Sequence, residues 1–391
     1  MSRPRVVHMS SVHMPHDPRI YGKECRTLAA AGYEVHLIAP GTTNETRDGV
    51  RIWGVGGPAA SHRARRITRT VADVTRLAHS LDGDVYQFHD PELIPSGLLL
   101  ARLGKRVIYD AHESVPDDIL LKTWIRPRLR GPVSGLAAAV EQVAARRFAA
   151  VVAATPTIGA RFAGYGARTI VVSNFPRIEE LPPAGPAGPA GAAKERAVCY
   201  VGSISEIRGA DVMVRAMEEI DGVLLLAGSF SSPELRARLA ASPGWNRVIE
   251  LGYIGLAELT RTLARSRAGL ALLAPTPTYI VSQPTKVYEY MAAEVPAIVS
   301  DFPLWRAIVE DNGCGLCVDP TDPLAVRRAI GWILDHPGEA DAMGRNGRRA
   351  VERHYRWEPE ADRLLALYEG VLRDAGSHTR RKRSSESISK I

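Results

Sequence analysis

Residues Leu181–Ala193 read LPPAGPAGPAGAA, and this stretch decides how the chain is divided. Proline, glycine and alanine alternate there, and such a run holds neither a helix nor a strand ladder. On both sides, short β-branched runs alternate with amphipathic segments, which is typical of parallel sheets. We therefore predict an α/β protein with two Rossmann-like domains, residues 1–180 and 197–375, a linker at 181–196 and a disordered basic tail at 376–391.

The alternation places strands and helices in both halves. In the first domain the expected strands are Arg5–Met9, Glu34–Ala39, Val50–Val55, Val85–His89, Arg106–Ala111, Ala150–Ala154 and Thr169–Ser173. In the second they are Ala197–Gly202, Val223–Gly228, Val248–Tyr253, Ala268–Ala274, Pro296–Asp301 and Gly315–Val318. Expected helices include Gly22–Ala31, Ser134–Phe148, Lys286–Ala293 and the final Pro359–Arg373, which should pack back on the first domain. Doubly wound sheets bind ligands beyond their strand carboxyl ends, so we expect the two domains to face one cleft.

The composition is that of a globular protein. The chain has 391 residues, 45% hydrophobic and 24% charged, with no signal-peptide pattern and no apolar run of ~18 residues. We expect a cytoplasmic protein. The four cysteines give no disulfide framework, and we expect no metal and no cofactor.

Positive charge is clustered along the chain. The net charge is +7, with Arg and Lys gathered at Arg63–Arg76, Lys122–Arg130, Arg146–Arg147 and Arg380–Arg383. No nucleic-acid-binding motif accompanies these clusters. They predict weak, salt-sensitive contact between the first domain and the inner face of an anionic membrane. Solvated basic faces, with a small soluble acceptor, are the alternative.

The second domain carries an anion-binding pattern. Ser282–Met291 reads SQPTKVYEYM, so Pro284 and Thr285 stand where a helix begins, with Thr285 able to cap it. Lys286 adds positive charge to that helix end, and Glu289 lies one turn on, where a carboxylate can accept two vicinal hydroxyls. The pattern fits a nucleoside diphosphate. A capped surface helix with a Lys–Glu pair is the alternative.

Other candidate residues follow strands. In the second domain, Gly202 and Ser203 open a turn in which Arg208 can reach a diphosphate, and Tyr253 ends another strand. In the first domain, three polar loops end strands on one rim of the sheet, where open α/β sheets bind ligands. These loops carry His16, Asp17 and Arg19, then His89 and Asp90, and then His112.

The chain resembles glycosyltransferase family 4, the retaining family of GT-B fold. The resemblance rests on VVHMSSVHMPHDPRIYGKECRTLAAAGYEVHLIAP near the start, FHDPELIPSGLLLARLGKRVIYDAHE, YVGSISEIRG, and PTKVYEYMAAEVPAIVSD followed by NGCGLCVDP. It implies transfer of a sugar, with retention and without metal, from a UDP-, GDP- or dTDP-linked donor. The acceptor would be a sugar, a lipid-linked molecule or a small molecule, in polysaccharide, glycolipid or glycosylated-metabolite synthesis.

The resemblance also implies residue roles. Glu289 would hold the donor ribose, and Lys286, Thr285 and Arg208 the diphosphate. His112 would contact the transferred sugar, with His16, Asp17, Arg19, His89 and Asp90 on the acceptor side. We therefore take His112, Arg208 and Lys286 as the catalytic candidates, and add Gly202, Ser203, Tyr253 and Pro284 to the donor side.

Some positions depart from the family pattern. Val281 stands where the first acid of the E-x7-E motif falls, and Ser203 where an Arg is usual. Pro15–Pro18 replaces a Gly-Gly turn, and Glu294 replaces a Gly. Two alternatives therefore remain: a nucleotide-sugar 2-epimerase of the same fold, and a non-catalytic nucleotide-sugar-binding partner of another transferase.

Overall fold

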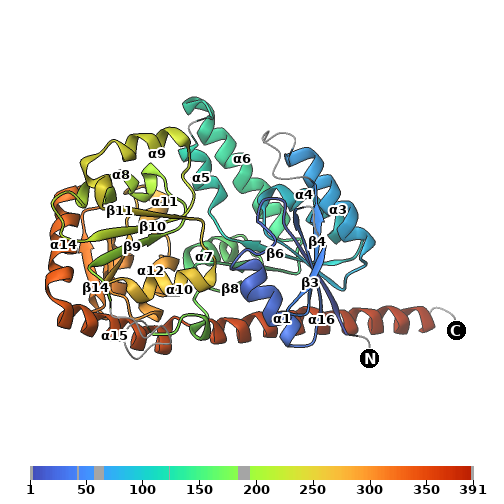
Figure 1. Ribbon diagram of the computed structural model, residues 1–391. Coiled ribbons are helices and arrows are strands. Elements are labelled where there is room, and N and C mark those ends of the chain that lie inside the picture. The colour runs from blue at the N-terminus through green and yellow to red at the C-terminus, as the bar shows by residue number, and fades with distance from the viewer. Residues whose placement is uncertain (1–2, 42–43, 57–65, 123, 184–193, 389–391) are drawn as a thin grey trace. The chain divides into compact units, whose positions relative to one another are not determined.

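The computed structural model describes residues 3–41, 44–56, 66–122, 124–183 and 194–388. These residues form two compact units, one of Met1–Asn174 with Glu358–Ile391, and one of Phe175–Trp357. Each unit is a parallel sheet covered by helices (Figure 1). No helix within the described ranges is long and apolar enough to cross a membrane.

The first unit contains an eight-stranded sheet in the order β3-β4-β2-β1-β5-β6-β7-β8. All neighbouring strands are parallel except β3, which runs antiparallel to β4. The strands are β1 (Arg5–Met9), β2 (Glu34–Pro40), β3 (Glu45–Arg47), β4 (Val50–Val55), β5 (Val85–Phe88), β6 (Arg106–Ala111), β7 (Ala150–Ala153) and β8 (Thr169–Val171). β1, β5, β6 and β7 are almost wholly buried, as expected for strands covered on both faces.

Helices flank this sheet. They are η1 (Ile20–Cys25), α1 (Arg26–Ala30), η2 (Arg66–Thr70), α3 (Val71–Ser80), η3 (Pro91–Leu93), α4 (Ile94–Arg102), α5 (Val115–Leu121), α6 (Pro127–Ala145), α7 (Pro156–Gly164) and α16 (Trp357–Ile388). The helix expected at Gly22–Ala31 begins at Ile20 as the π-helix η1. That wider turn carries Arg19 and Glu24 into the sheet rim.

The second unit contains a six-stranded parallel sheet in the order β11-β10-β9-β12-β13-β14. Its strands are β9 (Ala197–Val201), β10 (Val223–Ala227), β11 (Val248–Gly252), β12 (Ala268–Ala271), β13 (Ala297–Ser300) and β14 (Gly315–Val318). Its helices are η4 (Ile178–Glu180), η5 (Glu206–Arg208), α8 (Ala210–Ala216), α9 (Pro233–Ala240), η6 (Pro243–Arg247), α10 (Leu256–Arg265), α11 (Pro277–Ile280), α12 (Thr285–Ala292), α13 (Pro303–Glu310), α14 (Pro323–Asp335) and α15 (Pro337–His354).

The expected strands all form, and most end one to three residues before the predicted boundary. The central ten residues of the predicted linker, 184–193, lie outside the described residues. Both ends of that stretch are fixed to the second unit: Leu181 is buried in its core, and Lys194 pairs with Asp341 at 3.2 Å.

The C-terminal segment differs from its expectation. Residues 376–388, predicted as a disordered tail, continue α16 as helix, and residues 389–391 lie outside the described part. Arg, Lys and Glu are good helix formers, and a helix already nucleated by packing extends without a second nucleation step.

Two glycine turns shape the rim of the second sheet. Gly202 follows β9 with φ +139°, and Gly228 follows β10 with φ +140°. A Cβ on Gly228 would lie 1.8 Å from the carbonyl oxygen of Gly202, so only glycine fits there. The two turns are therefore pressed together at the carboxyl ends of neighbouring strands.

Candidate active site

The second unit brings a lysine onto the turn after β9. Lys286 lies in the first turn of α12, and a Cβ on Gly202 would approach its Cε to 2.8 Å and its Nζ to 3.0 Å. Its Nζ also lies 5.0 Å from the ring centroid of Tyr200, within cation–π range. The Tyr200 hydroxyl donates to the carbonyl oxygen of Ser203 at 2.7 Å, which fixes the same turn.

The charges around Lys286 favour an anionic ligand. Burial, followed by the positive charge of Arg208, lowers the pKa of Lys286 to about 8, and Glu289 opposes this shift. Arg208 also influences Tyr200, whose pKa burial raises. The charges of Arg208 and Glu289 therefore both act on Lys286 at this rim. An anion placed beside the two cations would relieve their repulsion.

The start of α12 differs from the sequence prediction in one respect. Thr285 is the first helical residue rather than the cap, and no side chain caps this end. Pro284 takes the N-cap position, and its carbonyl oxygen accepts from the N–H of Val287 at 2.9 Å. The positive end of the helix dipole is thus left without a side-chain acceptor.

Two predicted donor residues, Tyr253 and Ser203, are exposed. Tyr253 follows β11, two strands from β9, and is 88% exposed. Ser203 is exposed, and the contact given for it is made by its backbone carbonyl. The structure therefore places Gly202 against Lys286, with Arg208 near enough for its charge to act on the lysine.

In the first unit, the rim is organised around the buried carboxylate of Asp110 on β6. Arg19 donates to it twice, from Nη2 at 2.8 Å and from Nε at 3.2 Å. His89 Nδ1 lies 2.9 Å from Asp110 Oδ2, and His112 Nε2 lies 2.5 Å from the same oxygen. Burial opposes ionisation, but the charge of Arg19, then that of His112, holds the pKa of Asp110 well below its usual range.

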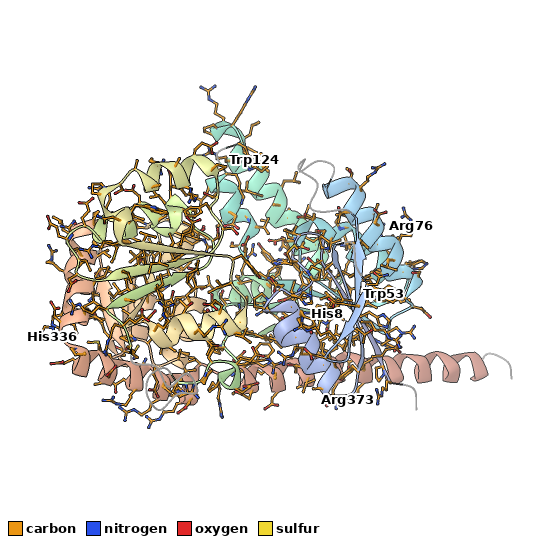
Figure 2. All side chains as sticks on the ribbon, viewed as in Figure 1. His8, Trp53, Arg76, Trp124, His336 and Arg373 are labelled. Carbon is orange, nitrogen blue, oxygen red and sulfur yellow. The ribbon has the colours of Figure 1, made fainter. Side chains whose placement is uncertain are left out.

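This cluster continues into the interior. His8 Nδ1 lies 3.0 Å from His89 Nε2, and His8 Nε2 lies 3.3 Å from the hydroxyl of Tyr368 on α16. Figure 2 labels His8 among the strands of the first sheet. Tyr368 donates to Gln87 Oε1 at 2.6 Å. Burial lowers the pKa of both His8 and His89, which favours the neutral form of each ring.

A second carboxylate fixes the loop after β1. Asp90 accepts from the Ser11 N–H at 2.6 Å and from the Ser10 hydroxyl at 2.9 Å. His13 lies between Asp90 and Asp17, at 3.4 Å and 3.1 Å, with its ring centroid 5.3 Å from that of His112. Burial alone would lower the pKa of His13, but the hydrogen bond that His13 donates to Asp17 and the charge of Asp90 raise it.

The predicted site residues of the first unit therefore fall into four groups. Three residues, Arg19, His89 and Asp90, are almost fully buried and form hydrogen bonds with neighbouring side chains or backbone. The side chain of His112 is 16% exposed and reaches the surface. Asp17 partners His13. His16 lies apart from this cluster, paired with Glu45 at 2.9 Å and set edge-on against Tyr21.

Sequence reasoning missed Asp110, His8 and His13. Asp110 and His8 lie inside apolar strands, and a charged or polar residue within a strand buried on both faces is itself a signal. Two groups of side chains place nitrogen or oxygen atoms that could bind a metal within 4.8 Å of one another. One group is His89, Asp110 and His112, and the other is His8, Glu24 and His89. Spacing in the sequence gave no sign of either group.

We predict that Asp110→Asn destabilises the first unit by about 3–5 kcal/mol, because it leaves Arg19 buried without its full counter-charge. Chemical denaturation followed by circular dichroism measures the loss. Asp73→Asn is the matched control, since Asp73 forms an exposed pair with Arg76 and its loss should cost less than about 1 kcal/mol. Equal effects of the two substitutions would show that the Asp110 cluster does not stabilise the unit.

Comparison with known proteins covers both units. Residues 22–175 match the model of a glycosyl transferase 4-like domain, and residues 195–336 match that of glycosyl transferases group 1. Among curated proteins, the chain is 30% identical over 188 residues to a D-inositol 3-phosphate glycosyltransferase of Segniliparus rotundus, covering 46% of this chain and 41% of that protein. The chain thus spans about two fifths of the length of the first curated relatives that it matches.

Solved structures extend the likeness to nearly the whole chain. A sucrose-phosphate synthase from Thermosynechococcus elongatus superposes with a TM-score of 0.74 at 20% identity, covering 95% of this chain and all of that one. Anabaena HepE, solved in complex with UDP-glucose, gives a TM-score of 0.69 at 14% identity, covering 94% and 99%. These likenesses concern the fold, and the two matched domain models together cover most of the chain. The chain belongs to the family 4 type of glycosyltransferases and has the GT-B fold.

Proposed function

We propose that this chain transfers a sugar from a nucleoside-diphosphate sugar to an acceptor hydroxyl. One observation carries the proposal: the ammonium of Lys286 lies against the Gly202 turn with Arg208 close enough to lower its pKa. Two neighbouring cations at the carboxyl end of β9 suit a diphosphate, which carries charge on both phosphates. The relatives' names support glycosyl transfer, and the UDP-glucose in the HepE structure supports a nucleotide-linked donor.

The remaining donor contacts follow from the same rim. Glu289 lies one helical turn beyond Lys286, where its carboxylate would accept the two ribose hydroxyls. The backbone at Gly202, Ser203, Pro284 and Thr285 would complete the diphosphate site. Tyr253 stands two strands away and would reach only the far part of a donor. These contacts do not distinguish among uracil, guanine and thymine as the base of the donor nucleotide.

Retention and metal independence are further parts of the proposal. As the diphosphate leaves, negative charge develops beside Lys286, Arg208 and the uncapped start of α12, and fixed positive charge there stabilises the transition state. A divalent ion would stabilise the same negative charge on the leaving diphosphate. The His89–Asp110–His112 group is a poor ion site, because the guanidinium of Arg19 already lies 2.8 Å from Asp110.

On the acceptor side, we infer that His112 contacts the transferred sugar. Asp110 accepts from its Nε2, which leaves Nδ1 as the nitrogen for a ligand. The burial of Arg19, His89 and Asp90 supports a positioning role for them, while His13 and Asp17 lie beside His112 at the surface. The basic clusters of this unit support an acceptor presented at an anionic membrane, and a small soluble acceptor is the alternative.

A non-catalytic nucleotide-sugar-binding role is the second candidate, because Val281, half-exposed after α11, replaces the expected acid. Incubation with radiolabelled UDP-, GDP- and dTDP-sugars and lipid or sugar acceptors, with and without EDTA, separates the two. We expect product in both conditions, with the donor's anomeric configuration by proton NMR. Binding of a donor without turnover on any acceptor would instead favour the non-catalytic role, and EDTA-sensitive turnover would contradict metal independence.

Donor binding and turnover should separate between two variants. Glu289→Ala removes the acceptor of two ribose hydroxyls, so nucleoside-diphosphate affinity should fall about tenfold to several hundredfold. His112→Ala should leave that affinity within about threefold but lower kcat strongly, because His112 is assigned to the sugar. Titration calorimetry and initial rates measure both, and Glu310→Ala, an exposed acid on α13, is the control for Glu289. Weakened nucleotide binding in the His112 variant with normal kcat would reverse the two assignments.

A further inference from the structure

Helix α6 of the first unit presents an apolar face to solvent. Five aliphatic side chains, spaced by 4, 3, 4 and 3 residues, lie on this face and are between 38% and 66% exposed: Leu129, Val133, Leu136, Val140 and Val143. Such spacing keeps residues on one side of a helix. We call these five residues the α6 face. Scattered exposed leucines are ordinary on protein surfaces, but a continuous stripe of this length marks an interaction site.

The turn before α6 adds further apolar surface. Leu120 and Leu121 end α5 and are 45% and 39% exposed, and Trp124, in the turn, is 63% exposed. Figure 2 labels Trp124 near the tip of the α5–α6 hairpin. The hydroxyl of Ser134 donates to the carbonyl oxygen of Pro116 at 2.8 Å and fastens α6 to α5. The two helices therefore hold the apolar residues on a preformed support.

Within α6 and its flanking residues, positive charge lies at the two ends of the helix. Residues 131–145 contain one ionisable group, Glu141, which is buried and paired with Arg161 at 2.7 Å. Arginines stand at both ends of the helix: Arg126, Arg128 and Arg130 at the start, and Arg146 and Arg147 at the end. Arg130, Arg146 and Arg147 donate hydrogen bonds to backbone carbonyl oxygens. A neutral carbonyl does not cancel the positive charge of the guanidinium.

Acidic groups of the hairpin lie at the start of α5, beside the part of α6 where Ser134 contacts Pro116. They are Asp117 and Asp118, with Glu113 just before them. Burial, together with the hydrogen bond and charge of Glu113, raises the pKa of Asp118 to about 7, which reduces the negative charge at neutral pH. The end of the hairpin that carries Trp124 and the arginines is thus the positive end.

The α6 face could be covered by a second copy of the chain or by an anionic lipid surface, and the charge pattern favours the lipid surface. A second copy of the chain would bring arginines against arginines in either orientation, because both ends of the helix are positive. The face is also small: α6 has 19 residues, about 28 Å of helix and about 10 Å of width, far below the ~800 Å² per partner of a stable interface. An anionic lipid surface meets cations at both ends and takes the aliphatic stripe between them.

We propose that the α6 face inserts into the headgroup–acyl boundary of an anionic membrane, with Trp124 and the arginines at headgroup level. A helix with one apolar face, flanked by Arg and Trp, lies in the plane of such an interface. The contact differs from the purely electrostatic, salt-sensitive one that the basic clusters predict, because burial of aliphatic surface is not screened by salt. The inference concerns the first unit and needs neither a bound donor nor turnover.

The test is co-sedimentation of the full chain with vesicles of equimolar phosphatidylglycerol and phosphatidylcholine, at low salt and at ~0.5 M NaCl. The double variant L136N/V140N removes the middle of the α6 face without touching a charge or a site residue. The control is L256N/L324N, two leucines of the second unit that are 48% and 54% exposed. We expect the α6 variant to lose about tenfold or more in vesicle affinity at both salt concentrations, and the control to bind like the wild type.

Two readouts keep the result interpretable. Thermal unfolding of both double variants should equal that of the wild type, since all four replaced side chains are exposed. Nucleoside-diphosphate binding by L136N/V140N should also equal the wild type, since α6 belongs to the first unit. Unchanged vesicle binding by L136N/V140N, or wild-type binding that vanishes at high salt, would overturn the proposal. Concentration-dependent dimerisation in sedimentation velocity that the same variant abolishes, with no vesicle binding, would assign the face to a second copy instead.

Discussion

The ammonium group of Lys286 lies against the backbone of the Gly202 turn, and the rim of the second unit is built around this contact. A side chain at Gly202 would displace the lysine, and one at Gly228 would strike the Gly202 carbonyl. Both turns have positive φ, which favours glycine. With Arg208 nearby, the lysine is held where its charge is disfavoured, and its pKa falls to about 8. The charge of Glu289 opposes this shift without cancelling it.

The rim of the first unit is built in the opposite way. Asp110 is as buried as any group in the chain, but Arg19, His89 and His112 satisfy it from within the same unit. Through His8 the cluster reaches Tyr368, so α16, at the far end of the sequence, belongs to the same hydrogen-bonded network. This rim presents His112 from a network of paired groups, whereas the rim of the second unit places Lys286 close to a second cation, Arg208. A rim of paired groups and a rim with two neighbouring cations suit the acceptor and donor halves of a transfer reaction.

The parallel sheets could be predicted from the sequence. Short, nearly continuous apolar runs such as Val107–Ala111 and Val223–Ala227 are typical of strands that helices cover on both faces. The sequence also placed Lys286 and Glu289 on one side of one helix. It did not predict the role of Asp110, because a single acid in an apolar run gives no partner, and Arg19 lies 91 residues away. The Tyr368–His8 contact spans 360 residues and could not be read from any local pattern.

Smaller errors have local causes. Thr285 was a plausible cap, but Pro284 already fixes the entry into α12, so the threonine became its first residue. The helix near Gly22 opened into a π-turn because Arg19 and Glu24 are drawn to the Asp110 cluster. The α6 face was visible as apolar residues, but its exposure depends on which neighbours pack against it, and three-dimensional packing alone supplies that information.

The central claim is that Lys286 binds the diphosphate of the donor. Titration calorimetry of UDP and GDP at pH 8, in HEPES and in Tris, counts the protons bound on complex formation. Because the pKa of Lys286 is about 8 in the free protein, an anion that raises it should draw in about half a proton per site, and Lys286→Met should abolish that uptake. Nucleoside-diphosphate binding with no proton uptake at pH 8, or with uptake unchanged in the Lys286→Met variant, would contradict the account.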